Sequence, residues 1–198
     1  MNYRSGILFI TGLLGFFLSF GQAEIDYRNK SLLKALEKSG VEDESDIEEI
    51  AIPESEANAS SINGKFFAIR ERGVNEYLYI YVGRVNSCRA GGCSISNDLP
   101  AEGESEYFDY YILFDENRTV RSVKVFNYQA THGHEVTAKG WLRQFIKYDG
   151  SRPLIVEKDI DSISGATISV YALTLDIEMK TKFLQQLKHK QISFSTSY

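Results

Sequence analysis

The chain has no excess of basic residues. Its 198 residues include 22 Lys and Arg against 27 Asp and Glu, which gives a formal net charge of −5. Binding to nucleic acid depends on clustered Lys and Arg, so this composition argues against a nucleic-acid partner. Internal repeats and low-complexity tracts are also missing, and about 175 residues remain after a short leader, which suits one domain with a proper core.

Cysteine is scarce, with only Cys88 and Cys93, in the stretch "NSCRAGGCS". Two cysteines supply too few ligands for a metal centre, and a haem attachment site needs two residues between its cysteines and a following His. The loop between them contains Gly91 and Gly92, so the two Cβ atoms can come within bridging distance. In an exported protein we therefore predict a Cys88–Cys93 disulfide.

A long hydrophobic run is missing as well. The longest apolar stretch, Ile7–Phe20, has about 14 residues, short of the ~20 that span a bilayer core. Arg4 precedes this stretch, and the small residues Gly21 and Ala23 come just before Glu24. This pattern predicts a secretory signal peptide over residues 1–23, with an uncleaved anchor as the alternative. We therefore expect export to the periplasm or to the outer face of the membrane.

The chain has no Gly-x-Ser-x-Gly nucleophile elbow, and the predicted disulfide leaves no free thiol. A nucleophilic hydrolase is therefore not favoured, and no catalytic residue is assigned.

We expect residues 24–60 to form an N-terminal helix and an acidic linker. The helix is predicted over Ser31–Ser39, with Ser31 as its N-cap and Gly40 beyond its end. Eight carboxylates and no basic residue follow between Glu42 and Glu56, and such a block is typical of a solvated, mobile segment. The regular spacing and glycine of a calcium loop are missing from it.

From Lys65 onwards the pattern of residues predicts β-strands. In "EYLYIYVGRV" the aromatic Tyr77, Tyr79 and Tyr81 alternate with aliphatic residues, which predicts a strand with one aromatic and one aliphatic face. "YFDYYILFD" and "TVRSVKVFNYQ" flank the turn "ENR" and predict an antiparallel hairpin. Because both runs are apolar at both parities, we expect the hairpin near the centre of a sheet covered on both faces.

Two further helices are predicted towards the C-terminus. A helical stripe runs from Val136 to Ile146, with Trp141 as a core residue rather than a cofactor stack and Gly150 at the end. Ser169–Lys188 fits both a strand and a helix pattern, and its length favours a helix. The predicted fold is α+β: one domain at residues 61–190, with helices packed on an antiparallel sheet and a tail at 191–198.

The stretch "DIDSISGATISV" places Ser164, Gly165, Ala166 and Thr167 at the start of the last predicted helix. Ser164 or Thr167 could cap this helix, and its free N–H groups would attract an anion such as phosphate. Gly165 permits unusual backbone conformations, and Ala166 leaves room between backbone and ligand. From this chemistry alone, a plain helix cap and a phosphate site both stay open.

"DIDSISGATIS" resembles the flavinylation motif of the FMN-binding domain family. That family includes the flavin-carrying subunits of the sodium-pumping NADH:quinone reductase and of Rnf electron-transport complexes. The resemblance implies that Thr167 carries FMN through a phosphoester bond. It covers about Tyr107–Leu187, and more weakly the strands before.

The upstream stretch "ATHGHEVTAKGWLRQF" is similar to the family's glycine-containing segment. Respiratory members commonly read Thr-Pro-Gly-Leu-Gly where this chain has Thr131, His132, Gly133, His134 and Glu135. The resemblance implies that Thr131–His134 line the flavin. From the residues alone, the two histidines could equally lie in a plain exposed loop, whereas a metal site would need a third ligand.

The resemblance implies that the protein is an exported electron carrier between a membrane donor and an unknown acceptor. Its FMN would be delivered from FAD by a flavin transferase, because a threonine hydroxyl is a weak nucleophile and the motif holds no base to activate it. The alternative is a cell-envelope binding or structural domain in which the Ser-Gly-Ala-Thr turn only caps a helix.

Overall fold

A computed structural model describes residues 23–41, 43–70, 77–89 and 105–187 of the chain. Residues 1–22 of the signal peptide predicted over 1–23, the cysteine loop with Cys93 and the tail at 191–198 lie outside these residues, so the signal peptide and the disulfide stay predictions. Among the described residues, no helix is both long enough and apolar enough to cross a membrane.

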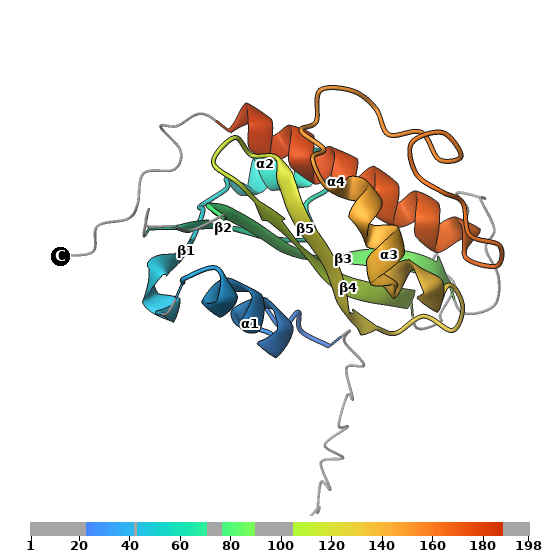
Figure 1. Cartoon of the computed structure of the whole chain (residues 1–198), viewed down its shortest axis with the longest axis horizontal. Coiled ribbons are helices and arrows are strands. Elements are labelled where there is room, and N and C mark those ends of the chain that lie inside the picture. The colour runs from blue at the N-terminus through green and yellow to red at the C-terminus, as the bar shows by residue number, and fades with distance from the viewer. Residues whose placement is uncertain (1–22, 42, 71–76, 90–104, 188–198) are drawn as a thin grey trace, which may run out of the picture.

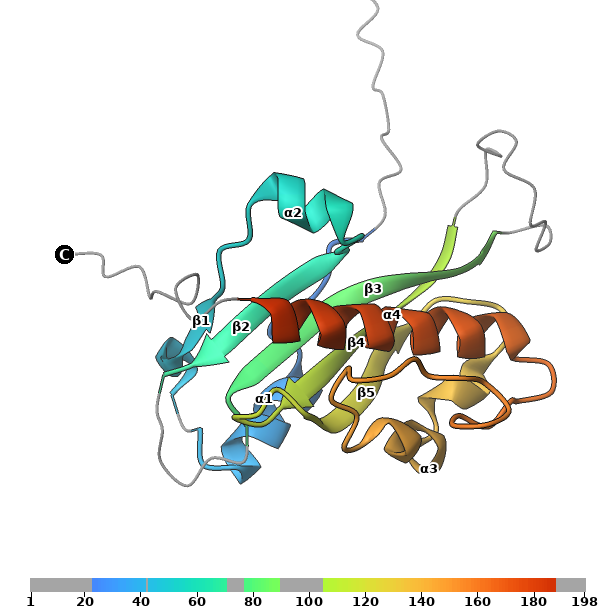
Figure 2. The ribbon, with the colours of Figure 1, turned by 90° about the horizontal axis from the view of Figure 1, so that it is seen from above.

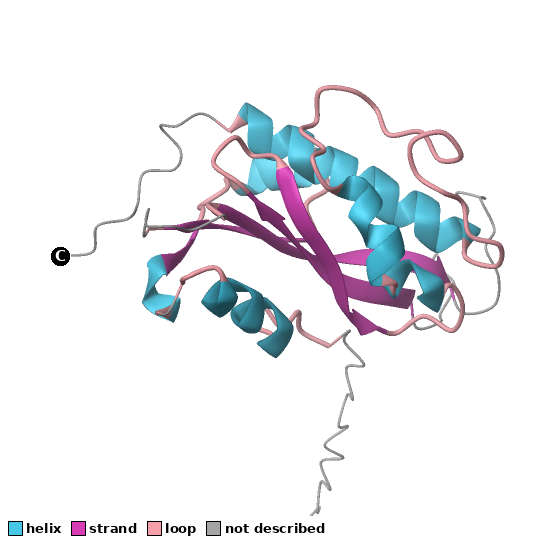
Figure 3. Cartoon of the chain, viewed as in Figure 1, coloured by secondary structure: helices cyan, strands magenta, loops and turns pink. Residues whose placement is uncertain are grey.

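The described residues are built around a five-stranded antiparallel sheet in the order β1-β2-β3-β4-β5, so that each strand pairs with its neighbour in the chain (Figure 3). The strands are β1 (Ile47–Glu49), β2 (Gly64–Ile69), β3 (Tyr79–Arg89), β4 (Ser105–Phe114) and β5 (Val120–Tyr128). The α-helices are α1 (Lys30–Lys38), α2 (Glu54–Ala59), α3 (Lys139–Leu142) and α4 (Thr167–Gln186). Short 3-10 turns occupy Glu44–Asp46, His134–Thr137 and Arg143–Phe145. The predicted α+β class is confirmed.

Helices cover both faces of the sheet. The long helix α4 and the short α3 lie on one face, and α1 lies on the other (Figure 1). Seen from above, α4 runs across the strands (Figure 2). The sequence explains why helices cover both faces of the sheet, because β3 and β4 carry apolar side chains at both odd and even positions and bury both of their faces.

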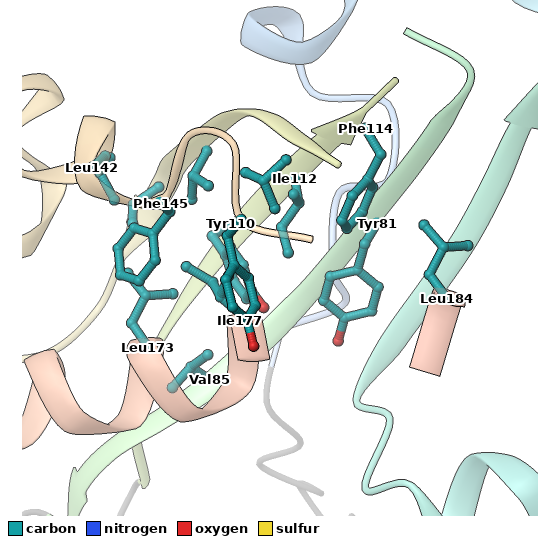
Figure 4. Packing of buried hydrophobic residues seen from close by; sticks show 14 of the residues in the cluster. Tyr81, Val85, Tyr110, Ile112, Phe114, Leu142, Phe145, Leu173, Ile177 and Leu184 are labelled. Carbon is teal, nitrogen blue, oxygen red and sulfur yellow. The ribbon is translucent and has the colours of Figure 1, made fainter. Parts of the chain in front are cut away.

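The alternation predicted for Tyr77–Val82 is confirmed only from Tyr79, where β3 begins. Tyr79 and Tyr81 point into the larger core cluster under α4, and Ile80 and Val82 point into the cluster under α1. Before the strand the prediction is wrong, because Tyr77 packs against the cluster under α1 and Leu78 against the larger cluster. Figure 4 shows Tyr81 within the larger cluster, together with residues from β4, α3 and α4. One strand therefore supplies aromatic packing to the face that carries α4 and aliphatic packing to the other face.

The acidic segment does not remain a solvated linker. Within it, β1 pairs with β2 through Ile47↔Ile69, and Ile47 and Ile50 are buried. The prediction missed this strand because Ile47 stands alone among carboxylates, and only pairing with β2 gives it a buried place.

Three local predictions need correction. The N-cap of α1 is Asn29, whose side-chain oxygen accepts from the backbone N–H of Leu32, so Ser31 is not the cap. β5 is an edge strand rather than a central one. The helix predicted over Val136–Ile146 is broken into α3 and two 3-10 turns, and Ile146 at its end is exposed.

The remaining helical predictions hold. Gly40 takes a positive φ of 97° just after α1, as expected of a glycine beyond a helix end. Trp141 is buried in the larger core cluster, which confirms its predicted place. The long C-terminal element is a helix, and Arg118 from the β4–β5 turn donates to the carbonyl oxygens of Leu184 and Leu187 at its end.

Candidate functional site

The segment that leads into the Ser-Gly-Ala-Thr turn is held by the α3 region. The indole Nε1 of Trp141 donates to the carbonyl oxygen of Asp161 at 2.8 Å, and the N–H of Asp161 donates to Oε1 of Gln144 at 2.8 Å. Further upstream, the carboxylate of Asp159 accepts from the N–H of Ile155. These bonds fix the backbone of the motif although most of its side chains are exposed.

The turn itself brings small residues to the start of α4. Gly165 has a φ of 82°, a conformation that favours glycine, and a Cβ placed there would meet no atom within 4 Å. Ala166 is 2 % exposed and packs into the core, whereas Ser164, Gly165 and Thr167 are exposed. The turn therefore combines a buried anchor with an open outer surface.

The N-cap of α4 is Ala166, and this position makes no side-chain capping hydrogen bond. The prediction that Ser164 or Thr167 caps the helix is therefore wrong. Thr167 is instead the first helical residue, with an exposed side chain. The first turn also carries no acidic side chain. The N–H groups of this turn remain available to an external acceptor, and the helix dipole favours an anion there.

The glycine-containing segment follows β5 directly. Gly133 has a φ of 86° and is buried, whereas Thr131, His132 and His134 are exposed. The hydroxyl of Thr131 donates to the carboxylate of Glu106 on β4. The left-handed glycine turns the chain from the end of β5 into the 3-10 turn His134–Thr137.

The fold brings the two predicted segments together at the first turn of α4. A Cβ on Gly133 would lie 2.6 Å from Oγ of Ser169, so the Gly133 backbone runs directly against the residue two places after Thr167. Oγ of Ser169 also lies 3.3 Å from the hydroxyl of Tyr128, which in turn donates to the carbonyl oxygen of His132 at 2.5 Å. The segments Thr131–His134 and Ser164–Thr167 therefore lie next to each other at the first turn of α4.

Sequence reasoning missed three residues at this place: Ser87, Tyr128 and Ser169. Oγ of Ser87, on β3, lies 2.9 Å from Oγ of Ser169. No signal in the sequence indicates these contacts, because serine and tyrosine are ordinary residues in strands and helices. Only Ser169 could have been suspected, from its place two residues after Thr167 at the end of "DIDSISGATIS".

The aromatic surroundings of Tyr128 are well defined. Its ring stacks on that of Phe108, with centroids 5.4 Å apart, and meets the ring of His134 edge to face at 5.2 Å. Burial is the main cause that raises the pKa of Tyr128, so its hydroxyl is neutral near pH 7 and able to donate.

The described residues contain no group of three or more His, Cys, Asp or Glu side chains placed to hold a metal ion. His132 and His134 are both exposed, and the ring of His134 contacts that of Tyr128. What the site offers is exposed hydroxyls, glycine turns and free N–H groups, a set that suits a phosphate-bearing ligand.

We compared the chain with models of known protein families and with curated proteins. No family model matches the chain, and no curated protein matches it.

Proposed function

We propose that this protein is an exported electron carrier with FMN joined to Thr167 through a phosphoester bond. It relays electrons between a membrane donor and a separate acceptor. One observation carries the proposal: the glycine segment, which the family resemblance links to the flavin, packs against Ser169, two residues after the attachment threonine.

The start of α4 fits the phosphate of such a cofactor. Ala166 offers no side-chain acceptor to the N–H groups of the first turn, and that turn carries no carboxylate to repel an anion. Above Gly165 a Cβ would find only open space, so a bulky group attached at Thr167 would meet no obstruction there. Thr131, His132, Gly133 and His134 would line the flavin from the other side.

Thr167 serves as the attachment residue and not as a catalyst. Its hydroxyl is a weak nucleophile, and the Ser-Gly-Ala-Thr turn contains no base, so attachment requires a flavin transferase that supplies FMN from FAD. The exposed side chain of Thr167 is accessible to such an enzyme. When bound, the flavin supplies the electron-transfer chemistry, and the protein holds and orients it.

The test is to express the mature chain together with an active flavin transferase and to measure its intact mass and in-gel flavin fluorescence after denaturation. We expect the added mass of one linked FMN, and its complete loss in Thr167→Ala. The structure suits this variant, because the Thr167 side chain makes no capping hydrogen bond whose loss would unfold the helix.

Ser162→Ala is the matched control, since Ser162 is another exposed hydroxyl in the same segment. It should keep the FMN mass. An unmodified wild-type chain in the presence of active transferase would overturn the proposal and leave a cell-envelope domain without flavin as the function to pursue.

A further inference from the structure

A chain of hydroxyl groups joins three elements at the start of α4. Ser87 on β3 lies 2.9 Å from Ser169 on α4, and Ser169 lies 3.3 Å from the hydroxyl of Tyr128 on β5. The chain ends at the carbonyl oxygen of His132, 2.5 Å from the Tyr128 hydroxyl. It therefore crosses from the sheet through the helix to the glycine segment.

The donors in this chain have a fixed order. A carbonyl oxygen can only accept, so the single proton of the Tyr128 hydroxyl goes to His132. Tyr128 must then accept from Ser169, and Ser169, having donated its only proton, must accept from Ser87. Every member of the chain uses its one proton, and loss of the Tyr128 hydroxyl would remove the donor to His132 and break the link between Ser169 and the glycine segment.

The glycine segment depends on this chain for its position. The Gly133 backbone lies so close to Ser169 that a Cβ would come within 2.6 Å of its Oγ and 3.0 Å of the Tyr128 hydroxyl. Thr131, His132 and His134 are exposed. Tyr128 holds two of them, His132 through its carbonyl oxygen and His134 through its ring, while Thr131 is bonded to Glu106.

We propose that Tyr128 and Ser169 are positioning residues of the flavin site: their hydroxyls hold the glycine segment Thr131–His134 against the first turn of α4. This inference rests on the proposed function, because it assigns these residues to the same FMN site. They act through the segment and not through the reacting atoms. Their part is to keep the two sides of the site at a fixed separation.

Tyr128→Phe removes the hydroxyl and leaves the ring to stack on Phe108 and contact His134. Tyr148→Phe is the matched control. The Tyr148 hydroxyl also donates to the carbonyl oxygen four residues later, that of Arg152, but in the loop after α3. Both variants remove the same kind of bond, and only one removes it at the site.

The experiment compares wild type, Tyr128→Phe, Ser169→Ala and Tyr148→Phe, each expressed with the flavin transferase. Intact mass records attachment at Thr167, and thermal denaturation records the fold. The absorption spectrum and midpoint potential of the native flavoprotein record the surroundings of the flavin. Amide hydrogen exchange over residues 131–137 is measured on chains produced without the transferase.

We expect all four proteins to carry one FMN. In Tyr128→Phe and Ser169→Ala, the flavin spectrum and potential should shift, and the amides of residues 131–137 should exchange about tenfold faster, as expected for one lost hydrogen bond. Tyr148→Phe should match wild type in both respects.

A flavinylated Tyr128→Phe protein with wild-type spectrum, potential and exchange would overturn this inference and leave the proposed function intact. A wild-type chain that carries no FMN would overturn the proposed function, and the assignment of Tyr128 and Ser169 to a flavin site with it.

Discussion

The indole Nε1 of Trp141 donates a hydrogen bond of 2.8 Å to the backbone carbonyl oxygen of Asp161. The ring is buried, and it packs edge to face against Phe145 at 5.4 Å between centroids. A core residue thus holds the segment that carries the Ser-Gly-Ala-Thr turn, although that segment itself is largely exposed. The Trp141–Asp161 hydrogen bond therefore links the packing of the core to the position of the segment before the Ser-Gly-Ala-Thr turn.

Trp141→Phe should destabilise the protein and loosen the motif segment. The smaller ring leaves a gap in the core and no donor for Asp161, so we expect a loss of about 1–3 kcal/mol in the free energy of unfolding, measured in urea. Gln144→Ala removes the acceptor of the Asp161 N–H and the donor to the carbonyl oxygen of Trp141, both of which water can replace, and leaves the buried ring in place, so it should cost less. Equal losses in the two variants would contradict this account.

The two glycines of the site should respond differently to substitution by Ala. Gly165→Ala meets open space and suffers only from its positive φ, which costs about 1–2 kcal/mol. Gly133→Ala has the same backbone strain and also forces Ser169 and Tyr128 to move, so it should cost more. In a Ser169→Ala background the additional cost should fall. Strict additivity in this double-mutant cycle would argue against the contact.

Arg84 and Asp109 form a buried ion pair on the α1 side of the sheet. Two hydrogen bonds of 2.7 and 3.0 Å join them, and the side chain of Asn127 also donates to Asp109 at 2.7 Å. Asp109→Ala leaves a buried guanidinium without this partner and should cost about 3–5 kcal/mol of unfolding free energy. The double variant Arg84→Met/Asp109→Leu should recover much of that loss in equilibrium denaturation. A double variant less stable than Asp109→Ala would contradict the prediction.

Acid should loosen the loop before the motif through Asp159. The N–H of Ile155, and then the guanidinium of Arg152, lower the pKa of this carboxyl below its ordinary 3.8. A carboxyl with a lowered folded-state pKa stabilises the fold above about pH 4, and that contribution is lost as the pH falls through the folded value.

Asp159→Asn keeps an acceptor for the Ile155 N–H but cannot titrate. Its stability should therefore fall less than that of wild type when denaturation curves at neutral pH are compared with curves below pH ~4. The same pH dependence in both proteins would exclude Asp159 as a source.

The sequence by itself determined the features that rest on local periodicity and backbone chemistry. Alternating residues at Tyr79–Val82 specified the two faces of β3, since successive side chains of a strand point to opposite sides. The length of the last apolar pattern specified α4. The short "ENR" turn between two β-rich runs specified the β4–β5 hairpin.

Only the tertiary structure decided the features that depend on a partner distant in the chain. β1 exists because Ile47 finds Ile69 on β2, and no local pattern in the acidic segment indicates it. The Gly133–Ser169 and Tyr128–Ser169 contacts likewise join residues about forty positions apart. Side chains of such ordinary types meet only after the sheet and α4 have packed, and for that reason the contacts that unite the two halves of the candidate site could not be predicted from the sequence.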